Sequence, residues 1–595
     1  MQKKQTILVV ASLLVVVLSV TLAYFTAQII GKGKDVLVTS ADLKIVFTDT
    51  DGNIEGNGIT PGWSNSKTFT VKNESNGTYK YDIIIKDLIN TFKTYKYLQY
   101  KITSTDGGYN MTDYSYLPKS STKEDVALAY EVSIDKGKTH TYTIEIKYVN
   151  DEYVDQSIDM GQSLSGTIYI REFTKPTMKL TDKLMADNPT IGTRTTFTAF
   201  TDTNTGTLYK ATEQIGTNPA KDVYYFAGDA KNNWVKFGKT TESSCTYKGK
   251  EVSYFDVTND HARTPENETE CTSTNICVAS VNPDSAALYS TGGSTGGSTG
   301  GHFELYFVGL TESECNENGG KWITNKSTWS EAIKDIYWRM IRTNADGSIK
   351  LLYAGTSPDT EKAYIGMSAF NTTYNDSMYV GYKYGTSGSL ENNRLNTNDS
   401  TIKTYVDNWY KNNLTAYTKY LSNDAVYCND RNLASGQTYS TTNGFNYAPY
   451  ERIDTNKQPT YNCTNMSDAF SVNNTSAKLD YPVGLMSIDE LSYAGGESYT
   501  VLTAPYAWYY TNANVESSYG SLQFWVLSPG DWRVSGSLAW LVDGSADPGV
   551  LYINFVSNSF AVRPSVSLSS CNLISRGNGS PENPYEIYTG SGVCE

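Results

Sequence analysis

The stretch HTYTIEIKYV, residues 140–149, decides the fold of the first part of the chain. Tyr142, Ile144, Ile146 and Tyr148 alternate with polar residues, so the apolar side chains share one face of an extended strand. The stretches KTFTVKN (67–73) and SLSGTIYIREF (163–173) repeat this period, and Gly, Asn and Asp clusters separate the repeats. Half-buried strands joined by turns predict a β-sandwich over residues 35–173. A helix-like piece, KDLINTF (86–92), is expected to interrupt it.

Composition limits the kinds of partner that the chain can have. The 595 residues suffice for several domains with their own cores. A net charge of −14 argues against nucleic acid as a partner. The chain has 47 tyrosines and 18 phenylalanines, so many of its aromatic side chains end in a polar hydroxyl.

The first 34 residues predict export. Lys3 and Lys4 precede an uncharged run, residues 5–31, which is long enough to cross a bilayer core of roughly 30 Å. Small residues at 21–23 also fit a signal-peptide cleavage site, which is preferred here to a permanent anchor. Either reading places the rest of the chain outside the cytoplasm, at the cell surface, with the N-terminal segment as its link to the membrane.

All eight cysteines lie at or after Cys245, and an even number in an exported chain predicts disulfides. Their positions favour local pairs, although eight cysteines allow 105 pairings. Zinc is the weaker interpretation because no pair of CxxC motifs is present. The cysteines form three neighbouring groups: Cys245, Cys271, Cys277 and Cys315; Cys428 and Cys463; Cys571 and Cys594.

Beyond the sandwich, a polar and threonine-rich segment, residues 174–215, predicts a connector to a C-terminal domain over 216–595. Residues 241–328 form an insertion that contains four cysteines and a flexible STGGSTGGSTGG tether at 290–301. Apolar residues at helical spacing predict a helix in STIKTYVDNWYKNNL (400–414), capped by Ser400. A second, shorter helix is expected in MSIDELSYAG (486–495).

Three stretches near the N-terminus resemble a known family: LAYFTA (22–27), SADLKIVF (40–47) and GWSNSKTFTVKN (62–73). They are similar to the camelysin and TasA-type exported surface proteins. The resemblance implies a jelly-roll-like sandwich that can self-assemble into fibres or decorate a cell. No HExxH motif is present, so the residues do not support protease activity.

The C-terminal part resembles formylglycine-generating-enzyme-like domains, a branch of the C-type-lectin fold with α+β architecture. Five motifs occur in the order typical of these domains: YWRMIRTNADGSIKLLYAG (337–355), YPVGLMSIDELSYAGG (481–496), FWVLSPG (524–530), FAVRPSVSL (560–568) and GNGSPENPYEIY (577–588). In the version most similar to this chain, the segment between the LSP and VRP motifs is a variable region diversified by a retroelement.

That segment, residues 531–558, is therefore the predicted ligand-binding face. Its rigid aromatics and adaptable polar groups have the chemistry of a paratope. The predicted contact residues are Asp531, Trp532, Arg533, Ser537, Trp540, Asp543, Asp547, Tyr552, Asn554 and Asn558. The ligand would be a protein or a glycan on another cell, a host or a phage. The plainer interpretation makes Trp532 and Trp540 core residues, and Arg563 is expected to be a buried structural residue paired with a carboxylate.

Two other functions stay open. An oxidase of the formylglycine-generating type would need its cysteines at Cys571 and Cys594, which lie outside the matched motifs. Histidine chemistry is not expected in the main domain because no histidine follows His302, and the adjacent Asp489 and Glu490 point different ways on a helix. We therefore expect no enzyme, cofactor or metal. A fibre or wall component, with the C-terminal domain as a spacer, is the other alternative.

Overall fold

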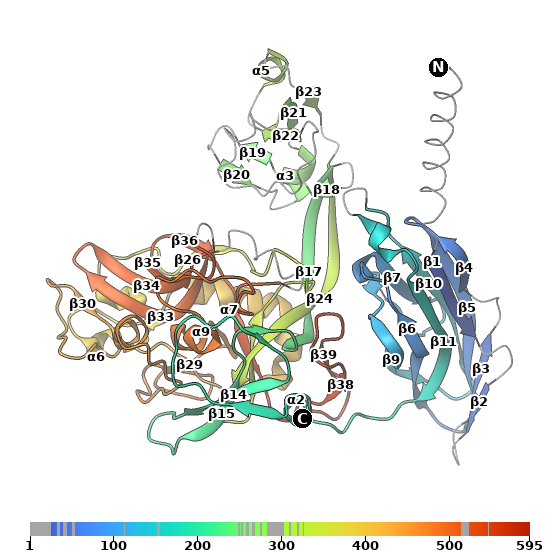
Figure 1. Ribbon diagram of the computed structural model, residues 1–595, viewed down its shortest axis with the longest axis horizontal. Helices are drawn as coiled ribbons and strands as arrows, with labels where there is room; N and C mark the ends of the chain where they lie inside the picture. Colours follow the sequence, from blue (N-terminus) through green and yellow to red (C-terminus); the bar gives the residue numbers. More distant parts are fainter. Residues whose placement is uncertain are drawn as a thin grey trace, which may run out of the picture.

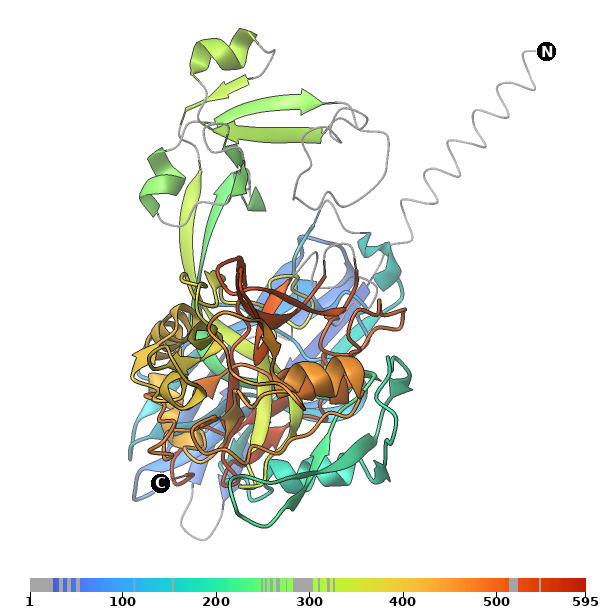
Figure 2. The same ribbon diagram turned by 90° about the vertical axis from the view of Figure 1, so that its left-hand side faces the viewer.

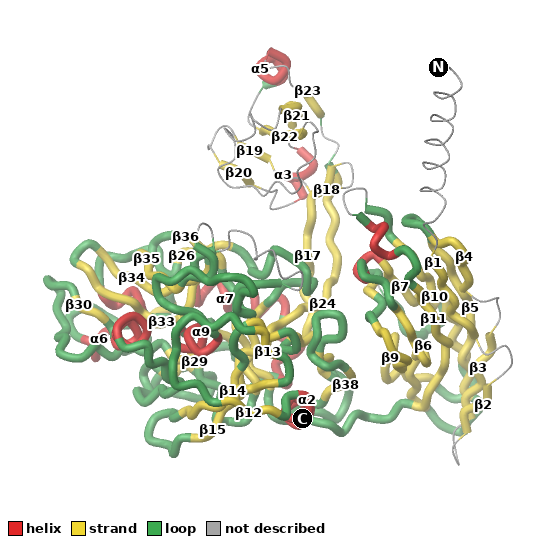
Figure 3. Tube along the Cα trace, in the orientation of Figure 1, coloured by secondary structure: helices red, strands yellow, loops and turns green. Residues whose placement is uncertain are grey.

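The computed structural model shows a mostly β chain divided into several parts (Figure 1). Strands and loops dominate, and the helices are short and scattered (Figure 3). The structure describes residues 25–594 apart from 32–35, 40–43, 50–53, 112, 152–154, 248–249, 252–253, 257–260, 264–267, 274–275, 282–302, 309–310, 318–320, 325–326, 513–522 and 545–546. Most of the predicted signal segment and the whole 290–301 tether lie outside these residues.

The N-terminal domain consists of two sheets that share one hydrophobic core. One sheet has the order β4-β1-β11-β6-β9 and the other β2-β3-β5-β10-β7-β8. The predicted alternation is confirmed in β10, where Tyr142, Ile144, Ile146 and Tyr148 are all buried. The strands are β1 (Phe25–Gly31), β2 (Val36–Thr39), β3 (Lys44–Asp49), β4 (Ile54–Ile59), β5 (Ser64–Asn73), β6 (Tyr79–Asn90), β7 (Leu98–Ser104), β8 (Ser115–Tyr116), β9 (Ser120–Ile134), β10 (Thr139–Tyr148) and β11 (Ser163–Glu172).

Two local predictions in this domain are corrected. The sandwich begins before residue 35, because β1 lies between β4 and β11 and pairs in parallel with β11. An apolar run cannot by itself distinguish a strand from a membrane segment. The expected helical piece at 86–92 belongs largely to strand β6, where Asp87 has a positive φ of 53° and the register with β9 shifts. Such a bulge breaks the period-two pattern and imitates helical spacing.

The main domain is built on an 11-stranded sheet that includes residues from the predicted connector. Leu180, Leu184 and Leu208 are buried in its core, so 174–215 belongs in large part to the domain. The polar composition hid this, because a few well-spaced leucines anchor the segment. Its principal elements are α2 (Leu180–Asp187), β12 (Thr190–Gly192), β14 (Thr207–Glu213), β15 (Lys221–Tyr225), β17 (Trp234–Tyr247), β24 (Thr328–Thr343), β25 (Ile349–Tyr353), β32 (Val483–Gly484), β37 (Ser565–Leu568), β38 (Ile574–Arg576) and β39 (Tyr585–Ile587).

A second, six-stranded sheet carries the predicted binding segment. Its central strands β33, β34 and β35 pair antiparallel in chain order. The strands are β26 (Met367–Ala369), β30 (Phe445–Asn446), β33 (Phe524–Arg533), β34 (Gly536–Val542), β35 (Leu551–Phe555) and β36 (Ser559–Ala561).

The insertion stands apart from both sheets on a ribbon made of β17 and β24 (Figure 2). These strands stay paired as far as Thr246 and Thr328. The ribbon ends in a small module with its own five-stranded sheet. The module contains β19 (Tyr254–Asp256), β20 (His261–Arg263), α3 (Glu268–Ser273), β21 (Ile276–Val281), β22 (Phe303–Val308), α5 (Glu312–Glu317) and β23 (Lys321–Ile323), and β18 (Lys250–Glu251) pairs with β17 at its base.

Both predicted helices are confirmed. Helix α7 (Thr401–Asn413) begins after Ser400, whose hydroxyl accepts the Lys403 N–H. Helix α9 (Ile488–Ala494) has a complete capping box between Ser487 and Glu490 and ends at Gly495 in the left-handed conformation. The short helix α8 (Ala448–Tyr450) continues into the π-turn η5 (Glu451–Thr455).

The prediction of local disulfides is also confirmed. The pairs are Cys245–Cys271, Cys277–Cys315, Cys428–Cys463 and Cys571–Cys594. Four disulfides are consistent with an oxidising, extracytoplasmic environment.

Candidate ligand-binding face

The predicted binding segment is not a loose surface stretch. Strand β33 pairs with β34 on one side and with β30 and β36 elsewhere along its length, so its backbone lies inside the sheet. Asp531, Trp532, Ser537 and Trp540 are all buried. The expectation that these four residues are surface contacts is therefore wrong, and the plainer interpretation of both tryptophans as core residues is confirmed.

Ser537 has a clear structural role. Its hydroxyl donates to the Asp376 carbonyl at 2.6 Å, and its N–H donates to the Tyr374 carbonyl at 2.8 Å. It therefore fastens β34 to the distant loop that contains Tyr374 and Asp376.

The other six predicted contacts reach the surface to different extents. The Arg533 side chain is 53% exposed, and Tyr552 is 37% exposed. Asp547 and Asn558 are exposed, whereas Asp543 and Asn554 are half-buried. Asn558 donates to Asn554 Oδ1 at 2.8 Å, which stabilises the turn after β35. The segment thus presents accessible side chains from a buried framework.

Tyrosines from two other segments complete this surface. Tyr499, which is 49% exposed, makes an edge contact with Tyr552 at a ring distance of 5.8 Å. Tyr450 packs on Trp540 at a ring distance of 5.7 Å, and its phenol lies near that of Tyr499. We call Tyr450, Tyr499, Arg533 and Tyr552, with the buried Asp531 and Trp540 beneath them, the aromatic face.

Tyr499 is held in a strained backbone conformation. Its φ is 52°, in the left-handed region that bulky residues rarely adopt. Its N–H donates to the Leu551 carbonyl at 3.1 Å, which fixes it against β35. Strain of this kind costs about 1–3 kcal/mol and concentrates at functional sites.

The face also lies over polar atoms that have no partner. Within the described part of the chain, Asp531 Oδ1 and the indole Nε1 atoms of Trp532 and Trp540 are buried without a hydrogen bond. By contrast, Trp525 Nε1, on the same sheet, donates to the Ser368 carbonyl at 3.0 Å. Each unpaired atom costs about 1–3 kcal/mol of folding free energy, so three such atoms destabilise this segment.

The electrostatics of the face make it rich in hydrogen-bond donors. Burial raises the pKa values of Tyr450 and Tyr499, and the charge of Asp454 adds to the rise in both, so both phenols keep their protons at neutral pH. Burial also raises the pKa of Asp531, against the opposing effect of Arg533. The Arg533 Nε–Asp531 Oδ2 distance is 3.0 Å, and this bond directs the exposed guanidinium.

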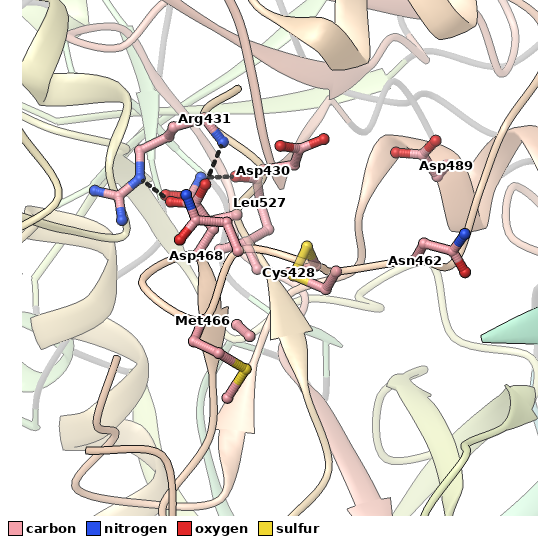
Figure 4. The surroundings of a disulfide bond; sticks show 12 residues. Cys428, Asp430, Arg431, Asn462, Met466, Asp468, Asp489 and Leu527 are labelled. Carbon is pink, nitrogen blue, oxygen red and sulfur yellow. Dashed lines mark hydrogen bonds and ion pairs between the residues drawn. A yellow bond between two sulfur atoms is a disulfide. The ribbon is translucent and has the colours of Figure 1, made fainter. Parts of the chain in front are cut away.

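A buried charged framework positions Tyr450. Arg452, two residues later, donates to both carboxylate oxygens of Asp489 at 3.0 Å and to Asp430 at 2.7 Å. Asp430 lies close in sequence to Cys428, which the disulfide joins to Cys463. Figure 4 shows Asp430 and Asp489 around this disulfide. The disulfide and the ion pairs together fix the turn that carries Tyr450.

A second ion pair lies on the other side of the same disulfide. Arg431 Nε donates to Asp468 Oδ1 at 2.7 Å, and both side chains are 1% exposed (Figure 4). Arg431 also donates to main-chain carbonyls of Lys383 and Asn393. These contacts make the core under the face rigid.

Arg563 is buried, as expected of a structural residue, but the acceptors that the structure shows for it are main-chain carbonyls instead of the expected carboxylate. Its guanidinium donates to the carbonyls of Tyr353 and Tyr509 and lies 4.8 Å from the Phe524 ring centre. It holds the end of β36 and the start of β37 against the rest of the core.

The groups considered for chemistry are engaged elsewhere. Glu490 accepts from Arg342 and Lys350, and Cys571 is bonded to Cys594. One acidic cluster, Asp399, Asp407 and Asp480, has carboxylates close enough to bind a cation. The Lys403 Nζ contacts all three carboxylates at 2.5–3.1 Å and supplies that positive charge.

No protein-family model matches the chain, and no curated protein shows significant similarity to it. Among the described residues, no helix is long and apolar enough to cross a membrane; residues 1–24, which contain most of the predicted membrane segment, lie outside them.

The sequence could not have identified Tyr450 and Tyr499 as site residues. They lie in NYAPYERI (446–453) and GESYTV (496–501), far from 531–558 along the chain. Only the pairing of Ser498 with Leu551 and the packing of Tyr450 on Trp540 bring these segments to the face.

Proposed function

We propose that the protein is an extracytoplasmic, surface-displayed binding protein and that the aromatic face contacts its ligand. The observation that carries this proposal is the exposed Tyr499–Tyr552–Arg533 surface over a rigid core that retains backbone strain and unpaired polar atoms. Tyrosine and arginine dominate binding hot spots because they offer large contact areas and several hydrogen bonds. The ligand is a protein or a glycan on another surface.

The separation between framework and accessible positions supports this proposal. A binding surface gains affinity when its contact side chains are held in place before the ligand arrives. Here the strands supply the buried Trp532, Ser537 and Trp540, and the exposed Arg533 and Tyr552 lie next to them. Substitution of the exposed residues would leave the sheet intact.

The family resemblances extend the proposal. The main domain would be an α+β domain of the C-type-lectin type, and retroelement-driven variation would change the exposed positions of 531–558 among cells. The N-terminal domain would be a jelly-roll-like, TasA-type module for display or self-assembly. The two domains have separate hydrophobic cores, which is consistent with a display module and a recognition module.

The test is binding of the whole chain to a glycan array and to intact bacterial and animal cells. The Arg533→Ala/Tyr552→Ala variant removes two exposed contacts and leaves the buried Trp532, Ser537 and Trp540 in place. Two such hot-spot contacts are worth about 2 kcal/mol or more, so we expect affinity to fall at least roughly thirty-fold.

The matched control is Lys210→Ala/Tyr224→Ala, which removes another cation and tyrosine, paired across β14 and β15. It is expected to bind like the wild type. Equal binding by the face variant and the wild type would refute the site. Failure of the wild type to bind any surface would favour the structural alternative, in which the main domain is a spacer.

A further inference from the structure

A cavity lies between the two large domains. Its volume is about 460 Å³, and its walls come from β7, β9 and the 109–116 loop on one side and from β17 and β24 on the other. Figure 1 shows β7 and β9 on the side of the N-terminal domain that faces β24 and β39. We call this cavity the tyrosine cleft, because its lining includes Tyr100, Tyr109, Tyr114, Tyr116, Tyr130 and Tyr337.

Direct contacts hold the two walls of the cleft in place. Lys96 Nζ forms an ion pair with Asp359 Oδ2 at 2.8 Å. Glu131 accepts a hydrogen bond from the Ser591 hydroxyl at 2.5 Å. Phe173 stacks on Tyr588 at a ring distance of 5.9 Å. These contacts give the cleft a defined shape.

A cluster of paired charges lies in the wall of the cleft. Glu586 lies 3.1 Å from Lys236 Nζ and 2.8 Å from Arg576 Nε, and Lys236 is also 3.5 Å from Asp335. Burial opposes ionisation of Glu586, but the two cations overcome it and lower its pKa to about 2. Two cations therefore face two carboxylates in this cluster, and Asp113, Lys239 and Lys334 bring the whole lining to one net positive charge.

Four tyrosine hydroxyls in the cleft have no hydrogen-bond partner in the part of the chain that the structure describes. Among the described residues, none forms a hydrogen bond with the hydroxyls of Tyr100, Tyr109, Tyr130 or Tyr337, although all four side chains are buried or half-buried. Burial raises all four pKa values, that of Tyr130 to about 12, so the hydroxyls remain protonated. Hydroxyls that line a cavity are satisfied by water or by a ligand.

We propose that the tyrosine cleft binds a short, neutral oligosaccharide. Its volume falls in the range of small-molecule sites, which often lie between domains. The tyrosine rings offer flat apolar surfaces, and their free hydroxyls both donate and accept hydrogen bonds. An apolar ligand would leave these hydroxyls unpaired, and the lining, with four cations against three carboxylates, leaves little net charge to hold an ion. This site is separate from the aromatic face.

The test is calorimetric titration of the whole chain with maltotetraose, cellotetraose and chitotetraose, each alone. The Tyr100→Phe/Tyr337→Phe variant removes one hydroxyl from each wall and keeps both rings. Because these hydroxyls have no partner in the free protein, the variant should unfold at the same urea concentration as the wild type. We expect at least one sugar to bind the wild type and the variant to bind it at least about tenfold more weakly.

The control is Tyr224→Phe, which removes a tyrosine hydroxyl on β15, away from both sites, and should not change sugar binding. Tyr552→Phe separately reports whether a sugar binds at the aromatic face. The proposal is overturned if none of the three sugars binds the wild type, or if the cleft variant binds as the wild type does. Loss of binding in Tyr552→Phe but not in the cleft variant would place the sugar on the face and would also overturn it.

Discussion

Two tryptophans on the same sheet provide a direct test of the unpaired polar groups beneath the aromatic face. Trp525 and Trp540 are 1% and 0% exposed. Trp525 Nε1 donates to the Ser368 carbonyl, whereas Trp540 Nε1 has no partner in the described part of the chain. Replacement of either by phenylalanine removes a similar buried area and leaves a similar cavity, so these costs largely cancel in the difference between the variants.

The remaining difference comes from hydrogen bonding. Trp525→Phe loses a hydrogen bond worth about 1 kcal/mol, whereas Trp540→Phe removes an unpaired N–H that costs about 1–3 kcal/mol. Trp525→Phe should therefore be the more destabilising by about 2–4 kcal/mol. Urea unfolding of the whole chain, followed by near-ultraviolet circular dichroism, measures this difference. Equal losses, or a larger loss in Trp540→Phe, would show that the Trp540 indole is satisfied and would refute the reasoning.

Three further variants test the framework and the domain junction. Arg452→Met leaves Asp489 as an unpaired buried carboxylate and should cost about 3–5 kcal/mol in urea unfolding, whereas a cost below 1 kcal/mol would show that the ion pair does not support the turn. Removal of the Cys428–Cys463 disulfide by a double alanine substitution should cost about 4 kcal/mol, from the loop it closes, and an unchanged midpoint would contradict this. Glu586 has a lower pKa in the folded chain than its ordinary 4.5, so its contribution is complete above pH 4.5 and is lost as pH falls toward 2. Glu586→Gln should flatten the acid side of the stability profile, and an unchanged slope would argue against the buried ion cluster.

Local patterns predicted the parts of the fold that local physics determines. The alternation around Ile144, the cap at Ser400 and the left-handed Gly495 depend on near neighbours, and the structure confirms all three. Short separations likewise indicated the disulfide partners. The bulge at Asp87 is not predictable from the sequence, because the period-two pattern of its strand breaks where the pairing with β9 shifts.

The site was only partly predictable, because its character depends on contacts between distant segments. A run of aromatic and polar residues such as 531–540 looks accessible until the pairing of β33 with β30 and β34 covers it. The exposure of Arg533 and Tyr552 against the burial of Trp532 and Ser537 follows from sheet registry. The contribution of Tyr499 depends on a strained backbone that no sequence pattern announces.

The measurement that tests the central claim most directly is sequencing of the gene segment encoding residues 528–564, with its downstream DNA, across many cells of one population. A diversified binding face predicts substitutions at the accessible positions Arg533, Asp543, Asp547, Tyr552, Asn554 and Asn558. It also predicts constancy at the buried Asp531, Trp532, Ser537 and Trp540, beside a near-identical template repeat. An invariant segment without such a repeat, or substitutions as frequent at the buried positions as at the accessible ones, would contradict it.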